Sequence, residues 1–260
     1  KTFFIIGAVI TVSWILCSIL FEAPAASGHL EKADSCPKST TDQPKQYTSA
    51  EMMRTKSFYL LFATMLFGLI SYFMVSPVSQ TYQTELGIPS AVAVSAVMLG
   101  SIVNAGARLI LPTISDKVGR IVCIKGVLIT AVLAMLVLTV SGSYAVTVAI
   151  VLMYGCYGGI MGSFPSFTSS IFGVEHTGEN YGFVMLGIVI ATFGAPVISG
   201  VVSGNGYGMN IVFGIGAGFA VAAFICLTLL DKNLKAEAKN RKEQKHEPGN
   251  NENFAGTCEE

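Results

Sequence analysis

The stretch of sequence that decides the fold is residues 91–141, AVAVSAVMLGSIVNAGARLILPTISDKVGRIVCIKGVLITAVLAMLVLTVS. Two apolar runs, 91–113 and 121–141, lie on either side of the short charged segment SDKVGR. Each run has about the 20 residues that a helix needs to cross the hydrocarbon of a bilayer. The stretch therefore predicts two membrane-spanning helices joined by a tight, charged turn, in which Gly119 permits the bend.

The composition extends this prediction to the whole chain. Of its 260 residues, 52% are hydrophobic and only 12% are charged, whereas soluble domains carry roughly 25% charged residues. The mean hydropathy is +0.62. The formal net charge is zero, so no nucleic-acid partner is predicted. Most of the chain is expected to face lipid or other helices rather than water.

Seven apolar runs are long enough to span a bilayer, and each is expected to be a helix, because open strands cannot satisfy their backbone in lipid. The runs are about 2–21, 57–80, 91–113, 121–141, 144–167, 181–203 and 208–230. The predicted fold class is an all-α membrane protein. Residue 1 is Lys rather than Met, and the first run is longer than the apolar core of a signal peptide. This run is interpreted as a helix whose predecessors are missing.

Two polar segments interrupt the apolar pattern and define four regions. They are a transmembrane helix (1–21), a basic, flexible linker (22–56), a six-helix block (57–230) and a polar tail (231–260). Lys and Arg gather on the cytoplasmic side of membrane proteins, so the linker, the loop 114–120 and the tail are expected in the cytoplasm. The loop 168–180 has Glu175 and Glu179 but no Lys or Arg. Only parity with its neighbours places that loop in the cytoplasm.

Arg108 is the only charge well inside any predicted span, and the spans contain no Asp or Glu that could pair with it. A charge inside a membrane is costly and needs a reason. One interpretation is an anion site, because a substrate carboxylate would supply the counter-charge and accept two parallel hydrogen bonds. Two structural alternatives stay open: the side chain extends toward the loop about 12 Å along the helix, or a missing part of the protein supplies a carboxylate. Asn104 lies one turn earlier on the same helix face. It would orient Arg108, contact the substrate, or do no more than pack against neighbouring helices.

The charged turn contains the pattern D-K-x-G-R, formed by Asp116, Lys117, Gly119 and Arg120. Between two spans, the carboxylate and the cations can bridge neighbouring helix ends or interact with their dipoles. The pattern resembles the gating-loop motif of the major facilitator superfamily, in its second-half copy between helices 8 and 9. The resemblance implies the major facilitator fold, with the first run as helix 6 and the six-helix block as helices 7 to 12. It also implies a missing N-terminal half as partner and a multi-pass location in the plasma membrane.

Further motifs with matching spacing resemble the oxalate/formate antiporter family and its monocarboxylate-transporter relatives. These motifs lie at residues 53–59, 104–108, 154–167, 171–173 and 179–182. In that family an Arg of helix 8 binds a substrate carboxylate, and the resemblance gives this role to Arg108. The family's oxalate transporter has a second cation, a Lys in helix 11, at the position of Ile188 in this chain. One cation matches one carboxylate, so the resemblance implies a monocarboxylate such as formate, lactate or pyruvate.

Other residues of the predicted spans are weaker candidates. Tyr154, Tyr157 and Tyr72 are candidate cavity residues that would contact the substrate. Pro165 and Pro196 mark predicted kinks, which could gate access but are also common in membrane helices. Small residues of the run 144–167 predict close contact with a neighbouring helix: Gly155, Gly158, Gly159 and Gly162.

The six cysteines have no CxxC or His–Cys spacing that would indicate a metal site or a disulfide framework. Four of them lie in apolar runs, where a thiol packs as a small apolar group. No cofactor and no metal are expected.

The predicted function is secondary active transport of a small monocarboxylate by alternating access, with an organic anion and the lipid bilayer as partners. Exchange of oxalate for formate stays open, and so does symport with protons. The alternatives are a seven-helix receptor and an anion-selective pore. A retinal receptor needs a Lys in its last helix, and residues 208–230 have none; a lone Arg could select anions in a pore. No His–Glu metal pair, Gly-x-Ser-x-Gly or phosphate loop indicates an enzyme.

Overall fold

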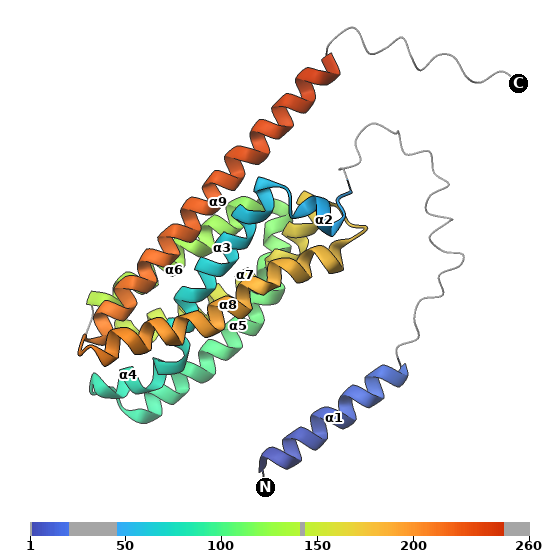
Figure 1. Cartoon of the computed structure of the whole chain (residues 1–260). Coiled ribbons are helices and arrows are strands. Elements are labelled where there is room, and N and C mark those ends of the chain that lie inside the picture. Colours follow the sequence, from blue (N-terminus) through green and yellow to red (C-terminus); the bar gives the residue numbers. More distant parts are fainter. Residues whose placement is uncertain (1, 21–45, 141–143, 247–260) are drawn as a thin grey trace, which may run out of the picture. The chain divides into compact units, whose positions relative to one another are not determined.

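The structure, a computed structural model, describes residues 2–20, 46–140 and 144–246, and every regular element in these ranges is a helix (Figure 1). The predicted turn at 141–143, most of the predicted linker, the end of the tail, Cys36 and Cys258 lie outside the described residues. The chain divides into two compact units, Lys1–Gln43 and Pro44–Glu260. Each unit is described by itself.

The first unit contains α1 (Thr2–Leu20), which begins and ends within a residue of the predicted run. The helix is apolar along Phe4–Ser18. Its Thr11 hydroxyl donates to the Gly7 carbonyl at 2.9 Å. A polar side chain of an apolar helix is thus satisfied by the helix's own backbone, as a segment in lipid requires.

The second unit is a bundle of helices. Its elements are α2 (Ser49–Met52), α3 (Lys56–Val75), the 3₁₀ helix η1 (Ser76–Val78), α4 (Ser79–Glu85), α5 (Ser90–Val118), α6 (Arg120–Val140), α7 (Ala145–Phe172), α8 (Thr177–Gly204) and α9 (Met209–His246). Within the described part of this unit, six spans are long and apolar enough to cross a membrane: Lys56–Glu85, Ser90–Val118, Arg120–Val140, Ala145–Phe172, Thr177–Gly204 and Met209–Asn240. The structure therefore confirms the predicted all-α membrane fold.

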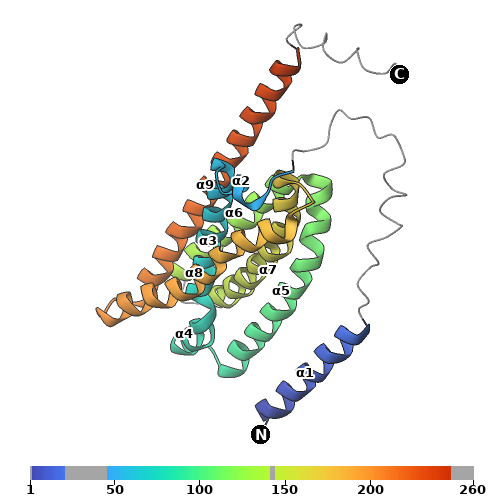
Figure 2. The ribbon, with the colours of Figure 1, turned by 45° about the vertical axis from the view of Figure 1, so that its right-hand side comes forward.

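The bundle is held together by apolar packing between neighbouring helices. α7 packs against α5 and α6, α3 packs against α8 and α9, and α6 also packs against α9 (Figures 1 and 2). Large side chains with almost no exposed surface fill the contacts, among them Phe164, Phe167, Phe213, Leu61 and Met65. Van der Waals contact between such side chains and close helix approach are what stabilise a bundle in lipid.

α5 and α8 are much less buried than α3 and α7. Only 11% of the most apolar window of α5 and 22% of that of α8 are buried, against 61% for the span of α3 and α4 and 56% for α7. Large apolar side chains such as Ile102 and Leu109 on α5, and Phe193 on α8, are exposed. In a membrane chain, such faces contact lipid or further protein.

Two predicted loops are shorter than the sequence indicates. α5 ends at Val118 and α6 begins at Arg120, so the predicted loop 114–120 reduces to Gly119. The φ angle of Gly119 is 106°, a conformation that glycine adopts without strain. On the opposite side of the bundle, Pro77 interrupts the long span at η1, and α4 covers the first half of the segment 81–90 between the first two runs of the six-helix block.

The polar tail begins as a helix, the continuation of α9 beyond residue 230. α9 continues to His246 and runs beyond the other helices in both views (Figures 1 and 2). Asn233 Nδ2 donates to the Ser57 hydroxyl at 3.0 Å, which ties this extension to the start of α3. Asp231 accepts from Lys125 at 2.6 Å, which ties it to α6.

The end of the predicted linker packs on the turn between α7 and α8. The Tyr47 N–H donates to the Phe172 carbonyl at 2.9 Å, and the Tyr47 carbonyl accepts from Asn180 Nδ2 at 3.0 Å. The Ser49 hydroxyl donates to Glu179 Oε2 at 3.1 Å. The acidic turn that the charge pattern left unexplained is therefore in direct contact with the last part of the linker.

Candidate functional site

Arg108 lies on α5 and is held by two neighbours. Its Nε–H donates to Asn104 Oδ1, one turn earlier on the same helix, at 3.2 Å. Its guanidinium carbon lies 5.5 Å from the centre of the Tyr157 ring of α7, within the distance at which a cation is attracted to an aromatic face. Both contacts restrict where the guanidinium lies.

Three tyrosines, which we call the tyrosine cluster, meet beside this cation: Tyr72 of α3, and Tyr154 and Tyr157 of α7. The rings of Tyr72 and Tyr157 are stacked, with centres 4.2 Å apart and planes 4° from parallel. Tyr154 meets Tyr72 edge to face at 5.4 Å. All three tyrosines predicted from the sequence are thus brought to one place, together with Arg108 and Asn104.

The charge of Arg108 has no counter-charge in the described parts of the chain, where no carboxylate forms an ion pair with it. Its terminal nitrogens also make no hydrogen bond to a described residue. Because Asn104 occupies Nε, the free donors are the two terminal nitrogens, which form a fork that matches a carboxylate. The residues that the structure describes include no group of three or more His, Cys, Asp or Glu that could hold a metal.

Two residues near Arg108 are not found by the sequence patterns. Tyr181, the fifth residue of α8, is close enough to interact electrostatically with both Arg108 and Tyr157. Pro112 lies inside α5, four residues after Arg108. The sequence alone could have drawn attention to Pro112, because it lies four residues after the one charge of the predicted span. The position of Tyr181 depends on how α8 packs, which the sequence pattern does not specify.

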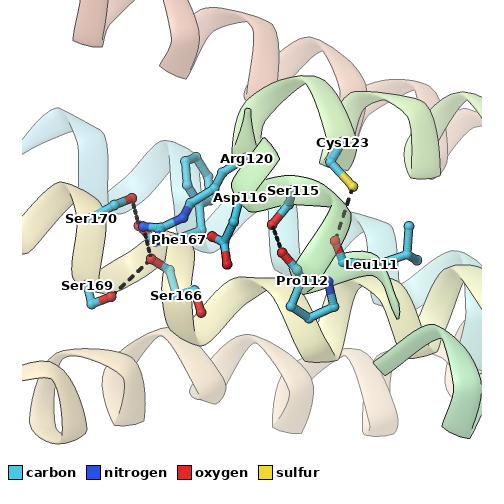
Figure 3. A network of polar contacts seen from close by, with 10 residues as sticks. All are labelled: Leu111, Pro112, Ser115, Asp116, Arg120, Cys123, Ser166, Phe167, Ser169 and Ser170. Atoms are coloured by element: carbon cyan, nitrogen blue, oxygen red, sulfur yellow. Dashed lines mark hydrogen bonds and ion pairs between the residues drawn. The ribbon is translucent and has the colours of Figure 1, made fainter. Parts of the chain in front are cut away.

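The gating-loop candidates form a separate site at the α5–α6 corner (Figure 3). Arg120 Nη2 lies 3.4 Å from Asp116 Oδ1, and Arg120 Nη1 donates to the Ser166 carbonyl of α7 at 2.6 Å. Lys117 is exposed and makes neither contact. Arg120 thus bridges the corner to the neighbouring helix α7.

Ile188, the position that the family resemblance gives to a second cation, is partly buried and packs against the apolar core. Its carbonyl accepts from the Thr192 hydroxyl at 2.8 Å. Nothing in this environment replaces the charge of a Lys. The described part of the site therefore contains one cation, that of Arg108.

A polytopic helical bundle with an unpaired cation, Arg108, away from the ends of a span is the class of protein that the fold and the site define. A sequence profile of the Major Facilitator Superfamily matches residues 1–186, which is more than half of the chain. The chain belongs to the Major Facilitator Superfamily. Membership of this superfamily of membrane transporters sets aside the receptor alternative and the enzyme class.

Two curated relatives narrow the likeness. The chain is 26% identical over 227 residues to the oxalate:formate antiporter of Oxalobacter formigenes, a match that covers 84% of this chain and 52% of the relative. It is 33% identical over 151 residues to the uncharacterized MFS-type transporter YhjX of Escherichia coli strain K12, which covers 57% of this chain and 38% of the relative. The chain therefore spans about half the length, or less, of the curated relatives it matches.

Proposed function

We propose that this chain is the second half of a secondary transporter for small monocarboxylate anions, and that Arg108 binds the substrate carboxylate. The observation that carries the proposal is the unpaired guanidinium of Arg108, held by Asn104 beside the tyrosine cluster. A cation in an apolar bundle costs several kcal/mol or more unless it gains a counter-charge. A carboxylate substrate supplies that charge each time it binds.

The geometry favours an end-on, two-pronged contact. Asn104 accepts the Nε–H of Arg108, so the two terminal nitrogens remain for the two oxygens of one carboxylate. Tyr157 attracts the guanidinium to its ring face, and Tyr72 stacks on Tyr157 from the other helix. Arg108 is exposed in the described bundle, so the rest of the transporter would have to cover it before these aromatic side chains could exclude water and strengthen the charge pair.

The chemical class of the substrate follows from the number of cations. The relative from Oxalobacter formigenes is named for two carboxylates, oxalate and formate. With one cation at Arg108 and an apolar side chain at Ile188, this chain matches one carboxylate group. We therefore favour formate, lactate or pyruvate over oxalate, with either a second anion or a proton moving in exchange or in symport.

The remaining parts of the proposal concern the whole protein. The first half of the transporter would cover the exposed faces of α5 and α8, the two least buried spans, and complete a cavity around Arg108. Residues 1–21 would be helix 6, residues 22–56 the linker, residues 57–230 the transport domain and residues 231–260 the tail. The linker, the α7–α8 turn and the tail would face the cytoplasm at the plasma membrane.

The topology has a direct test. A single cysteine is placed at Glu175, in the α7–α8 turn, and cells are treated from outside with a thiol reagent that does not cross membranes. We expect the reagent to label neither this cysteine nor one placed in the linker. Labelling at Glu175 alone would contradict the six-helix block, because an even number of spans separates the two segments.

The substrate proposal is tested in full-length protein reconstituted into liposomes, with radiolabelled formate, lactate and pyruvate as probes. Arg108→Lys keeps the charge but loses the planar fork, so we expect severe loss of uptake of the best probe. Arg54→Lys, on an exposed arginine beside α2, is the matched control and should transport normally. Wild-type transport by Arg108→Lys and Arg108→Ala would refute the role of Arg108. Single-channel currents without counter-flow would indicate a pore instead of a carrier.

A further inference from the structure

The contact between α5 and α7 is made by glycines of α7 that lie against the backbone of α5. A methyl group placed on Gly162 would come within 2.6 Å of the Arg108 carbonyl oxygen and 2.9 Å of its Cα atom. A methyl group on Gly158 would overlap the Asn104 carbonyl oxygen and lie 3.0 Å from its Cα atom. Backbone atoms cannot rotate away as the end of a side chain can. Any larger residue at these two positions therefore moves α5 away from α7.

These contacts share one register. The two residues of α5 are one turn apart, the two glycines of α7 are one turn apart, and the earlier member of one pair meets the earlier member of the other. Gly100 continues the series one turn before, since a methyl group there would come within 2.9 Å of Tyr154 Cγ. The two helices therefore run in the same direction and keep their register along the part of α5 that carries the site.

Pro112 adds an independent feature at Arg108. Proline has no backbone N–H, so the Arg108 carbonyl lacks the donor that the fourth following residue of a helix supplies. The hydrogen of Gly162 that an added methyl group would replace points at this oxygen. Such Cα–H···O contacts recur where helices cross closely. α7 therefore supports α5 from outside at the residue where the hydrogen bonding of α5 is interrupted.

We propose that Gly158 and Gly162 are positioning residues of the anion site. Tyr157 precedes Gly158 on α7, and its ring centre lies 5.5 Å from the guanidinium carbon of Arg108 on α5. The glycines set the separation of the two helices, so they also set where the cation lies relative to the tyrosine cluster. This inference rests on the proposed function, because it concerns the geometry of the carboxylate site at Arg108.

A glycine that only permits packing would behave differently from a positioning glycine. Its replacement lowers the yield or the melting temperature of the protein, but the protein that folds binds its substrate normally. Replacement of a positioning glycine changes the substrate affinity of protein that folds. The deciding readout is therefore the KM of the best-transported probe, compared with the melting temperature measured without substrate.

The test uses the full-length transporter in liposomes and the variants Gly162→Ala and Gly158→Ala. Gly218→Ala on α9 is the matched control, since a methyl group there meets no atom within 4 Å. Misplacement of a binding group by about 1 Å can cost on the order of 100-fold, so we expect each variant to raise KM by on the order of tenfold to 100-fold. The maximal rate should change less, and the control should change neither quantity.

Arg108→Ala is measured in parallel, so that the two inferences fail separately. If Arg108→Ala transports the probe as wild type does, the proposed function is wrong. If Arg108→Ala is inactive while both glycine variants fold and keep the wild-type KM, the proposed function stands and the positioning role is overturned. Where neither glycine variant folds, Gly100→Ala decides, because its methyl group lies in the same register and would come within 2.9 Å of Tyr154 Cγ and 3.2 Å of Tyr154 Cβ, next to the backbone of α7. A raised KM there supports the positioning role, and a wild-type KM overturns it.

Discussion

Arg108 and Arg120 lie on either side of the turn at Gly119, and their surroundings are opposite. Arg120 has an acidic partner on the preceding turn, Asp116, and donates to the carbonyl of Ser166 on a neighbouring helix. Arg108 has an amide and an aromatic ring as neighbours, and no described carboxylate pairs with it. One arginine has its charge and its donors satisfied by the protein, whereas the other keeps its terminal donors available for a ligand.

The largest expected effect separates the two arginines by substrate affinity. Arg108→Ala should weaken binding of the best-transported monocarboxylate by about 30-fold to several thousand-fold, which corresponds to about 2–5 kcal/mol for a charge pair that the whole transporter would bury. Arg120→Ala should leave the Kd nearly unchanged, because this side chain bonds to protein groups. Equilibrium binding to purified full-length protein measures both.

The comparison would break in either of two ways. Arg120→Ala could weaken binding as strongly as Arg108→Ala, which would place the corner in the substrate site. Alternatively, a well-folded Arg108→Ala protein could bind with wild-type affinity, which would make Arg108 a structural residue that extends toward the loop. Melting temperatures of both variants control for loss of folding.

The second prediction turns Arg108 into a paired arginine. Asn104→Asp places a carboxylate where the Nε–H of Arg108 already donates at 3.2 Å. The substrate must then compete with an internal counter-charge, so we expect the Kd to rise on the order of tenfold or more. Asn104→Leu is the matched control: it removes one hydrogen bond without adding charge, and should cost about 1 kcal/mol, or about fivefold in Kd. Equal effects of the two variants would argue against an anion site.

Much of this arrangement is predictable from the sequence because it depends on neighbours along one helix. Seven apolar runs predict the helices, and the spacing of Asn104 and Arg108 predicts that they share a face; the structure confirms both. The glycines of the run 144–167 predict a close contact, although only the packed structure shows that they meet the backbone of α5.

What the sequence does not predict is contact between segments far apart in the chain. The stacking of Tyr72 on Tyr157 depends on how α3 and α7 cross, and no local pattern specifies that crossing. The packing of Tyr47 on the α7–α8 turn cannot be predicted from the sequence, because the polar segment around Tyr47 has the composition of a linker. Charge counting also fails for this turn, since Glu179 is satisfied by a serine rather than by a cation.

The third prediction concerns the ring that holds the Arg108 guanidinium. Tyr157→Ala should raise the Kd by about tenfold, because it removes the ring under the cation and the stacking partner of Tyr72, which together are worth about 1.4 kcal/mol. Tyr157→Phe keeps the ring and should stay within about threefold of wild type. If the two variants weaken binding equally, the hydroxyl group contacts the substrate, and the cation–ring contact is not the reason for the tyrosine.

The smallest expected effect on affinity is that of Asp116→Asn. The ion pair with Arg120 is long, at 3.4 Å, and the Asp116 side chain is 61% exposed, so the pair should contribute at most about 1 kcal/mol to stability. It lies outside the tyrosine cluster, and the substrate Kd should stay within about twofold. The transport rate should fall much more, because the pair orients the arginine that ties the α5–α6 corner to α7, and this tie must rearrange when the helices move between states.

Glu85→Gln, on an exposed acid of α4 at the other end of the bundle, is the matched control and should change neither quantity. A loss of affinity as large as the loss of rate in Asp116→Asn would show that the corner acts on the substrate site itself, and the contrast between the two arginines would no longer hold.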